Sequence, residues 1–259
     1  MTDLRPQSIA ALYDIHGNLP ALEAVLSEVR SHGVERIVIG GDVVPGPLFR
    51  EALAVLFALD IPTEFIKGNG EVAVLETRAG GVSEPVPEQA REVIQWTAAS
   101  LDSEHARWMA AWPMALRREV PGIGPVLFCH GTPRHHNEIF TARTPDDRLR
   151  PIFAPLNVAL VVCGHTHAPF DRTVGATRVV NAGSVGMPFG DAGADWLLID
   201  GARIESRHTA YDLDAAAARI RQSDYPHADA FVDRFVLSRP TLQQMLEIYS
   251  KSELQYGGK

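Results

Sequence analysis

Residues 9–42 read IAALYDIHGNLPALEAVLSEVRSHGVERIVIGGD, and two short apolar runs flank a helical pattern in this stretch. The runs IAALY and RIVIG are continuously apolar, which is typical of strands buried on both faces of a sheet. Apolar residues recur at helical spacing between them: Leu19, Leu22, Val25, Leu26 and Val29. Asn18 is a candidate N-cap and Gly33 a candidate C-terminal stop for this helix. The order strand, helix, strand predicts a right-handed βαβ unit and a layered α/β protein.

The rest of the chain extends this pattern. Further strand-like runs occur at residues 64–66, 125–128 and 158–163, and residues 48–60 read as a second crossover helix. We expect a helical insertion over residues 72–118, made of a loop at 80–88 and two short helices within 88–112. After residue 170 the pattern predicts hairpin strands, with Asp200-Gly201 as a two-residue turn signal. Residues 212–259 read as a helical tail, and we expect one domain over residues 1–259.

Composition and net charge limit the classes of protein to which this chain can belong. With 46% hydrophobic and 22% charged residues the chain resembles ordinary globular proteins. A net charge of −8 argues against binding nucleic-acid polymers, whose affinity comes mainly from Lys and Arg on phosphates. The sequence has neither a signal-peptide pattern nor a membrane-length apolar run, so we expect a cytoplasmic protein without membrane contact. Cys129 and Cys163 lie in apolar runs, which suits reduced core residues.

Metal-ligand side chains follow five of the apolar runs. They are Asp14, His16, Asp42, Asn69, His130, His165 and His167. Each motif alone has an ordinary explanation as a cap or turn, but the pair in Gly164-His165-Thr166-His167 is poorly explained by packing. Because the carboxyl ends of strands in an open α/β sheet face one crevice, we expect the seven side chains to converge there. Imidazoles mixed with carboxylate and amide oxygens suit divalent Mn, Fe, Co or Zn better than Ca or Mg.

Taken in order, these motifs resemble the calcineurin-like metallophosphoesterase superfamily, in particular its small prokaryotic phosphoesterase branch. The resemblance covers residues 8 to about 190 and includes Asn181-Ala-Gly-Ser-Val-Gly186, where the branch has Pro in place of Ala182. It implies a four-layer α/β/β/α sandwich. It also implies hydrolysis of phosphate mono- or diesters of small molecules by a metal-bridging hydroxide.

The resemblance further implies a two-metal site. One ion would be held by Asp14, His16, Asp42 and His167. The other would be held by Asp42, Asn69, His130 and His165, with Asp42 bridging the two. Two divalent ions activate a hydroxide near neutral pH and clamp the phosphoryl oxygens during in-line attack. Mn is the first candidate for both ions, with Fe, Ni, Co or Zn as alternatives.

Two departures from the family pattern bear on mechanism. Many members have a histidine after the asparagine, where this chain has Gly70. We hypothesise that His135 or His136 supplies the missing proton donor or a substrate contact, with Arg134 as a phosphate fork; the alternative is that all three are solvated loop residues. Residues 44–47 read Val-Pro-Gly-Pro, where protein phosphatases of the superfamily carry Asp-Arg-Gly, which disfavours a phosphoprotein phosphatase.

Two other classes of protein compete with this interpretation. The same fold serves as a protein-interaction scaffold in a eukaryotic sorting complex, where the metal site has decayed. All seven expected ligands are intact in this chain, which disfavours the scaffold. A metallo-β-lactamase-like hydrolase would need a His-x-His-x-Asp-His run, and the chain has none. The sequence leaves the substrate, the native metal and the oligomeric state open.

Overall fold

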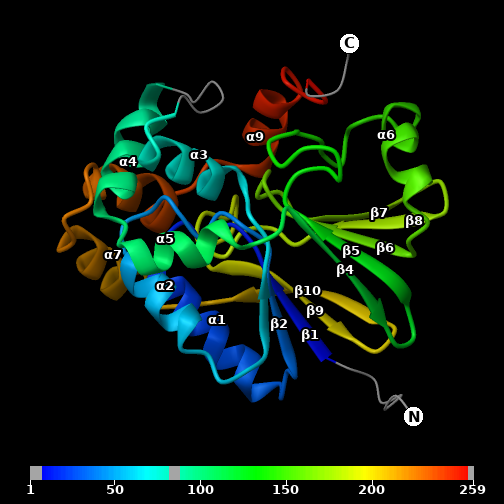
Figure 1. Ribbon diagram of the computed structural model, residues 1–259, viewed down its shortest axis with the longest axis horizontal. Coiled ribbons are helices and arrows are strands. Elements are labelled where there is room, and N and C mark those ends of the chain that lie inside the picture. The colour runs from blue at the N-terminus through cyan, green and yellow to red at the C-terminus, as the bar shows by residue number, and fades with distance from the viewer. Residues whose placement is uncertain (1–7, 82–87, 256–259) are drawn as a thin grey trace.

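Two five-stranded sheets form the centre of the computed structural model, which describes residues 8–81 and 88–255 (Figure 1). In strand order, the first sheet consists of β10 (Arg203–Thr209), β9 (Ala194–Asp200), β1 (Ser8–Leu12), β2 (Arg36–Ile39) and β3 (Thr63–Phe65). The second sheet consists of β4 (Ala115–Val120), β5 (Gly124–Cys129), β6 (Leu160–Cys163), β8 (Thr177–Asn181) and β7 (Phe170–Val174). Both sheets are mixed, with parallel strands at their centres.

The opening stretch folds as predicted. Strands β1 and β2 pair in parallel, and helix α1 (Leu19–Ser31) connects them. The side chain of Asn18 accepts a hydrogen bond from the backbone N–H of Ala21 and caps the helix. Gly33 follows the helix with φ +62°, a left-handed conformation that suits glycine. Helix α2 (Phe49–Phe57) makes the second crossover, before β3.

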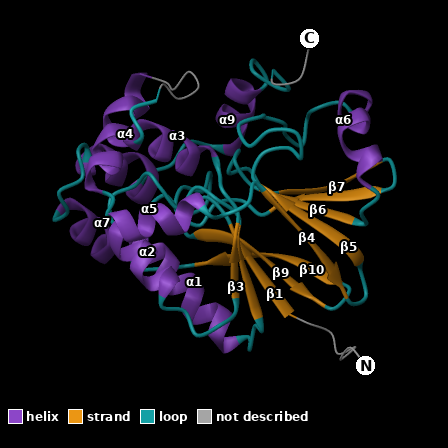
Figure 2. Cartoon of the chain, viewed as in Figure 1, coloured by secondary structure: helices purple, strands orange, loops and turns teal. Residues whose placement is uncertain are grey.

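The layers are those of an α/β/β/α sandwich (Figure 2). The inner faces of the two sheets pack together through apolar side chains such as Ile9, Val38, Phe128 and Val162. A larger core joins the outer face of the first sheet to α1, α2 and the helices beyond them. A smaller core joins the outer face of the second sheet to α6 (Asp146–Phe153), followed by the short turn η1 (Ala154–Leu156). The predicted four-layer fold is confirmed.

Residues 72–118 differ in part from the prediction. The two predicted helices are α4 (Glu88–Ser100) and α5 (Ser103–Ala110). A further helix, α3 (Asn69–Arg78), begins where the sequence suggested only a turn, and β4 forms where no strand was predicted. Most of the loop expected at 80–88 lies outside the described residues. The prediction of a single domain over residues 1–259 stays a prediction.

The C-terminal third contains the expected hairpin and helices. In the hairpin of β9 and β10, Asp200 pairs with Arg203, so the two turn residues are Gly201 and Ala202, one position later than predicted. The helical tail comprises α7 (Leu213–Arg221), α8 (Ala228–Phe231), the π-helical turn η2 (Val232–Leu237) and α9 (Leu242–Tyr249). Within the described ranges, no helix is both long and apolar enough to span a bilayer.

Candidate metal centre

The seven predicted ligands come from the carboxyl ends of five strands. Asp14 and His16 follow β1, Asp42 follows β2, and Asn69 is the first residue of α3, just after β3. His130 directly follows β5, and His165 and His167 follow β6. The loops are held together by backbone hydrogen bonds such as that from His16 N–H to the carbonyl of Asp42, at 2.8 Å. Strand ends from both sheets therefore meet at one place.

The backbone at these loops is unusual. Asp14, His16, Asp42, His165 and His167 all have positive φ, between 46° and 66°. Residues other than glycine rarely adopt this left-handed backbone conformation, which costs on the order of 1–3 kcal/mol per residue. Such outliers cluster at functional sites, where the surrounding structure holds them in place. The strain therefore coincides with five of the seven predicted ligands.

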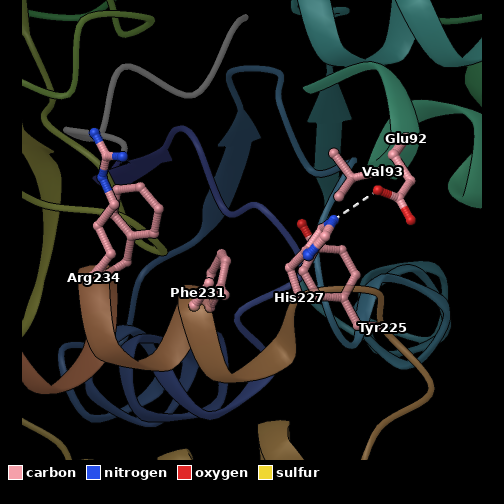
Figure 3. Close-up of a pocket in the computed structure, with 8 residues that line it drawn as sticks. Glu92, Val93, Tyr225, His227, Phe231 and Arg234 are labelled. Carbon is pink, nitrogen blue, oxygen red and sulfur yellow. Dashed lines mark hydrogen bonds and ion pairs between the residues drawn. The ribbon is translucent and has the colours of Figure 1, made fainter. Parts of the chain in front are cut away.

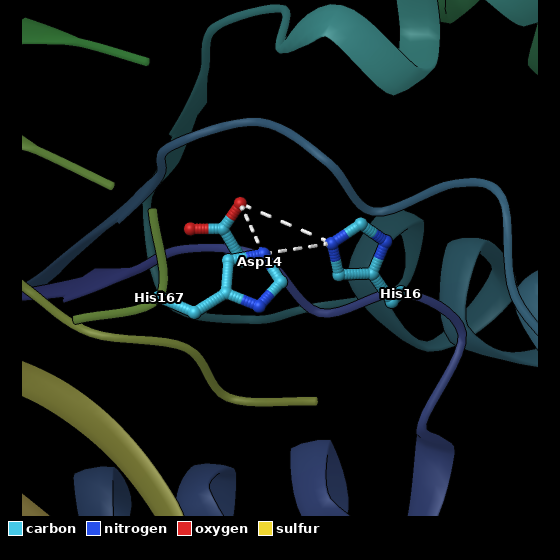
Figure 4. A group of neighbouring side chains, drawn as sticks. All are labelled: Asp14, His16 and His167. Carbon is cyan, nitrogen blue, oxygen red and sulfur yellow. Dashed lines mark hydrogen bonds and ion pairs between the residues drawn. The ribbon is translucent and has the colours of Figure 1, made fainter. Parts of the chain in front are cut away.

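One set of ligands is Asp14, His16 and His167, named here the His16 group (Figure 4). The Nε2 atoms of His16 and His167 lie 3.2 Å apart, and Asp14 Oδ1 lies 3.4 Å from His167 Nε2. The Nδ1 atoms bond outward, that of His167 to the Met187 carbonyl at 3.0 Å and that of His16 to the Pro45 carbonyl at 3.3 Å. These bonds orient both rings so that Nε2 faces the centre of the group.

The structure also brings Asp14, Asp42 and His130 together, with Asp14 Oδ1 3.7 Å from His130 Nε2, and Asn69 and His165 lie beside His130. The four residues predicted to hold the second ion, Asp42, Asn69, His130 and His165, are named here the His130 group. His130 Nδ1 bonds to the Gly40 carbonyl at 2.8 Å, while its Nε2 lies 3.1 Å from Asn69 Oδ1 and 3.5 Å from Asp42 Oδ2. The rings of His130 and His165 are 5.2 Å apart between centroids. The two groups adjoin, since Asp42 Oδ2 is also 3.7 Å from His16 Nε2.

Two buried atoms within these groups point to a bound cation. Asp14 Oδ1 and His165 Nε2 are buried, and neither has a hydrogen-bond partner within the described chain. Leaving such atoms unpaired costs about 1–3 kcal/mol each, more for a charged oxygen. Divalent ions held by the two groups would satisfy these atoms, because a carboxylate oxygen and an imidazole nitrogen are ordinary ligands of such ions. The residues present therefore fit the metal site that the sequence predicts.

The charges of the two groups also favour a cation. Burial lowers the pKa of His165 to about 3, with His130 adding to the effect, so this imidazole is neutral and its lone pair is available. Although burial works against it, Asp42 and Asp14 raise the pKa of His130 to about 10. Burial likewise opposes ionisation of Asp14, but His167 and His130 hold the pKa of its carboxyl below the ordinary value. An incoming ion therefore meets ionised carboxylates and would displace the proton of His130.

Glu71 braces the His130 group and is absent from the sequence prediction. Its buried carboxylate accepts four backbone N–H bonds, from Asp42 and Gly68 on Oε2 at 2.8 and 2.7 Å, and from Val43 and Val44 on Oε1 at 2.7 and 3.2 Å. It thereby joins the loop after β2 to the loop after β3. Burial and the nearby Asp42 raise the pKa of Glu71 to about 7. This carboxylate positions the ligands without being one of them.

Gly70 occupies a position that is too narrow for any side chain. A Cβ atom there would lie 2.0 Å from the Val44 carbonyl oxygen, and the Gly70 N–H donates to Asp42 Oδ1 at 2.7 Å. The loop after β2 would have to move to admit a histidine. The absence of a histidine after Asn69 is therefore built into the backbone, and this position cannot supply a side-chain proton donor.

Arg134, His135 and His136 lie in the loop after His130. The Nε and Nη2 atoms of Arg134 contact the buried carboxylate of Glu138, which also accepts from Thr132 Oγ1 at 2.5 Å. A phosphate-binding role for Arg134 would use Nη1 or require this ion pair to open. The rings of His135 and His136 stack with centroids 4.4 Å apart. The roles assigned to these three residues stay predictions.

A two-sheet sandwich with candidate metal ligands gathered at its strand ends is the arrangement of a metallophosphoesterase fold. The family profile described as "Calcineurin-like phosphoesterase superfamily domain" matches residues 8–202. This chain belongs to that superfamily, and the resemblance read from its motifs is confirmed.

Individual proteins resemble this chain in sequence or in fold. The crystal structure of a metallophosphoesterase from Sphaerobacter thermophilus is 26% identical, with a TM-score of 0.68 over 89% of this chain and 98% of that one. The protein PH1004 of Pyrococcus horikoshii OT3 shares the fold at 22% identity, with a TM-score of 0.72 over 87% of this chain and 96% of its own. The uncharacterized protein MJ0912 of Methanocaldococcus jannaschii is 26% identical over 84% of this chain and 93% of its own.

Proposed function

We propose that this protein hydrolyses phosphate mono- or diesters of small molecules, using two divalent transition-metal ions of which Mn is the first candidate. The proposal rests above all on one observation: seven ligand-type side chains from five strand ends lie together, and two of their buried atoms lack hydrogen bonds within the described chain. Membership of the calcineurin-like phosphoesterase superfamily supports it. When bound, two such ions activate water and neutralise phosphoryl oxygens.

The chain's own residues would hold and orient these ions. Asp14, His16 and His167 would hold one, and Asn69, His130 and His165 the other. Asp42 would contact both, because its Oδ2 faces His16 and His130 while its Oδ1 is fixed by the Gly70 N–H. His135 or His136 would supply the missing proton donor or a substrate contact, and Arg134 would contact the phosphate.

Metal reconstitution with a substrate panel tests this proposal. Metal-free protein is loaded with Mn, Ni, Fe, Co or Zn and assayed on cyclic nucleotides, nucleotides, sugar phosphates and nitrophenyl mono- and diesters. We expect close to two ions per chain and hydrolysis that requires metal. His105→Ala, a surface histidine paired with Asp102, is the matched control and should bind and hydrolyse normally. Less than one ion per chain with no hydrolysis would favour the protein-interaction scaffold instead.

A further inference from the structure

The segment of residues 181–187, named here the 181–187 turn, begins at the last residue of β8 and contacts both loops of the His16 group. The Val185 N–H donates to the Tyr13 carbonyl at 2.9 Å, next to the loop after β1. The Ala182 N–H donates to the Cys163 carbonyl at 2.9 Å, at the end of β6. The turn therefore joins the strand end that precedes Asp14 to the strand end that precedes His165 and His167.

The Ser184 hydroxyl lies at the centre of this turn and is completely buried. It donates to the Asp14 carbonyl at 2.8 Å and accepts from the Met187 N–H at 2.8 Å. The Met187 carbonyl in turn accepts from His167 Nδ1 at 3.0 Å. One hydroxyl therefore links two members of the His16 group, Asp14 through its own carbonyl and His167 through Met187.

The Asp14 backbone depends on such contacts because its φ of +54° is left-handed. A residue persists in that conformation only where the surrounding structure holds it there. The Asp14 carbonyl accepts two bonds from the turn, one from Ser184 Oγ and one from the Gly186 N–H at 3.0 Å. Its Oδ2 accepts from the His165 N–H at 2.8 Å, which leaves Oδ1 3.4 Å from His167 Nε2. The position of this metal-facing oxygen therefore depends on the turn.

Asn181 attaches the other side of the turn to the loop after β6. Its buried Nδ2 donates to the Gly164 carbonyl at 2.7 Å and to Thr166 Oγ1 at 3.1 Å, on either side of His165. Its Oδ1 accepts from the Gly183 N–H at 2.9 Å, within the turn itself. With this side fixed, the Ser184 hydroxyl meets Asp14 and Met187 in one arrangement.

We propose that Ser184 is a positioning residue for the His16 group: its hydroxyl fixes Asp14 relative to His167 and thereby sets the affinity of this group for a divalent ion. The inference rests on the metal-dependent phosphoesterase function proposed above. Ser184 acts through two backbone groups, the Asp14 carbonyl and the Met187 N–H, and not through a ligand atom of its own. Since Glu71 joins different loops, those of the His130 group, changes at Ser184 and Glu71 should weaken different ions.

The test compares Ser184→Ala with the loss of another buried hydroxyl. Thr97 is also completely buried, and its Oγ1 donates to the Val93 carbonyl at 2.7 Å within α4. Val93 lines a separate hollow of about 420 Å³ between α4 and the helices of the tail, together with Glu92 and Arg234 (Figure 3). None of the predicted ligands lines that hollow. Thr97→Val therefore removes a buried hydroxyl away from both ligand groups.

Calorimetric titration of the metal-free, full-length protein with Mn gives a readout that does not depend on turnover. His167→Ala removes a ligand of the His16 group and so identifies the binding phase that belongs to it. Outer-shell residues change metal affinity about 10–100-fold, so we expect Ser184→Ala to weaken that phase by this factor and to leave the other phase within about twofold. Thr97→Val should leave both phases unchanged, although both variants should lower the Tm by a similar amount. Ser184→Thr, which keeps the hydroxyl, should bind Mn within about threefold of wild type.

Hydrolysis distinguishes this role from the proposed function. With Ser184→Ala, cleavage of 4-nitrophenyl phosphate should fall at limiting Mn and recover at excess Mn, because the change lowers affinity and removes no ligand. Unchanged Mn binding in Ser184→Ala, equal weakening of both phases, or the same weakening in Ser184→Thr would overturn the role of Ser184 while the phosphoesterase proposal stood. Wild-type protein that binds two ions but hydrolyses no ester would overturn the phosphoesterase proposal and leave the positioning role intact.

Discussion

The two ligand groups adjoin but differ in their surroundings. The His130 side chain is completely buried, whereas 13% of the His16 side chain is exposed. Glu71 braces the His130 group by joining two loops, whereas single carbonyl contacts orient the rings of the His16 group. The His16 group also adjoins Phe189, whose ring stacks on that of His167. We therefore expect the His130 group to retain its ion more tightly, and the His16 group to face the incoming substrate.

Asp42→Ala should have the largest effect, because it removes the carboxylate that faces both groups. Its Oδ2 lies within 3.7 Å of His16 and His130. Metal ions contribute several kcal/mol to phosphoryl transfer, so we expect kcat to fall by about 10³-fold or more. Metal analysis and ester hydrolysis measure the loss. The exposed Asp60→Ala is the control, and two tightly bound ions in Asp42→Ala would contradict the shared role.

Glu71→Gln should weaken one group selectively. The amide of glutamine cannot accept the four N–H bonds that the carboxylate accepts, so the loops after β2 and β3 should separate. Outer-shell residues typically change metal affinity about 10–100-fold, and we expect that loss in the His130 group only. Calorimetric metal titration should resolve one weakened and one unchanged phase. The exposed Glu104→Gln serves as control, and equal weakening of both phases would refute the distinction between the groups.

Metal binding to the His130 group should depend on pH. The pKa of His130 is raised to about 10, so its imidazole carries a proton at pH 7 that an ion must displace. The pKa of His165 is lowered to about 3, so its imidazole carries no extra proton at pH 7. Apparent affinity should therefore rise about tenfold per pH unit between pH 6 and pH 8. In the metal-free protein the same shift stabilises the fold below pH 6.5, and that stabilisation is lost as the pH rises towards 10. Calorimetric metal titration in buffers of different ionisation enthalpy counts the protons released on metal binding. A count of zero at pH 7 would contradict displacement of the His130 proton.

His135→Ala and His136→Ala should have the smallest effects. If these side chains contact the substrate, each change should raise KM about three- to tenfold, the contribution of one hydrogen bond, and leave kcat nearly unchanged. The effect should be equal on phenyl and nitrophenyl phosphate. Unchanged kinetics on both esters would assign the two residues to the solvated loop.

Most of the fold could be predicted because its strands are continuously apolar and its first helix carries its own cap. Strand β4, with the sequence ALRREV, could not, since four of its six side chains are exposed and it forms by pairing with β5. The start of α3 was also missed, because Gly68-Asn69-Gly70 is typical turn composition. Its capping interaction comes from Glu71, whose carboxylate accepts from the Gly68 N–H.

Some residues of the candidate site could be predicted from the sequence, and others could not. The seven candidate ligands could be singled out because they lie just after apolar runs and because their order resembles a known family. The sequence contains one local indication of the role of Glu71. This acidic residue lies three positions after the helix N-cap Gly68, which is the spacing of a capping box.

The left-handed backbone at five of the candidate ligands affects which residues selection for stability would favour at these positions. Glycine adopts positive φ without steric cost, so replacing Asp14, His16, Asp42, His165 or His167 by glycine would relieve strain as well as remove a ligand. Laboratory evolution of the metal-free protein towards heat resistance alone should therefore enrich glycine at these five positions. Hydrolysis would decline in the same variants, so heat resistance and catalysis would select opposite residues at the same backbone sites.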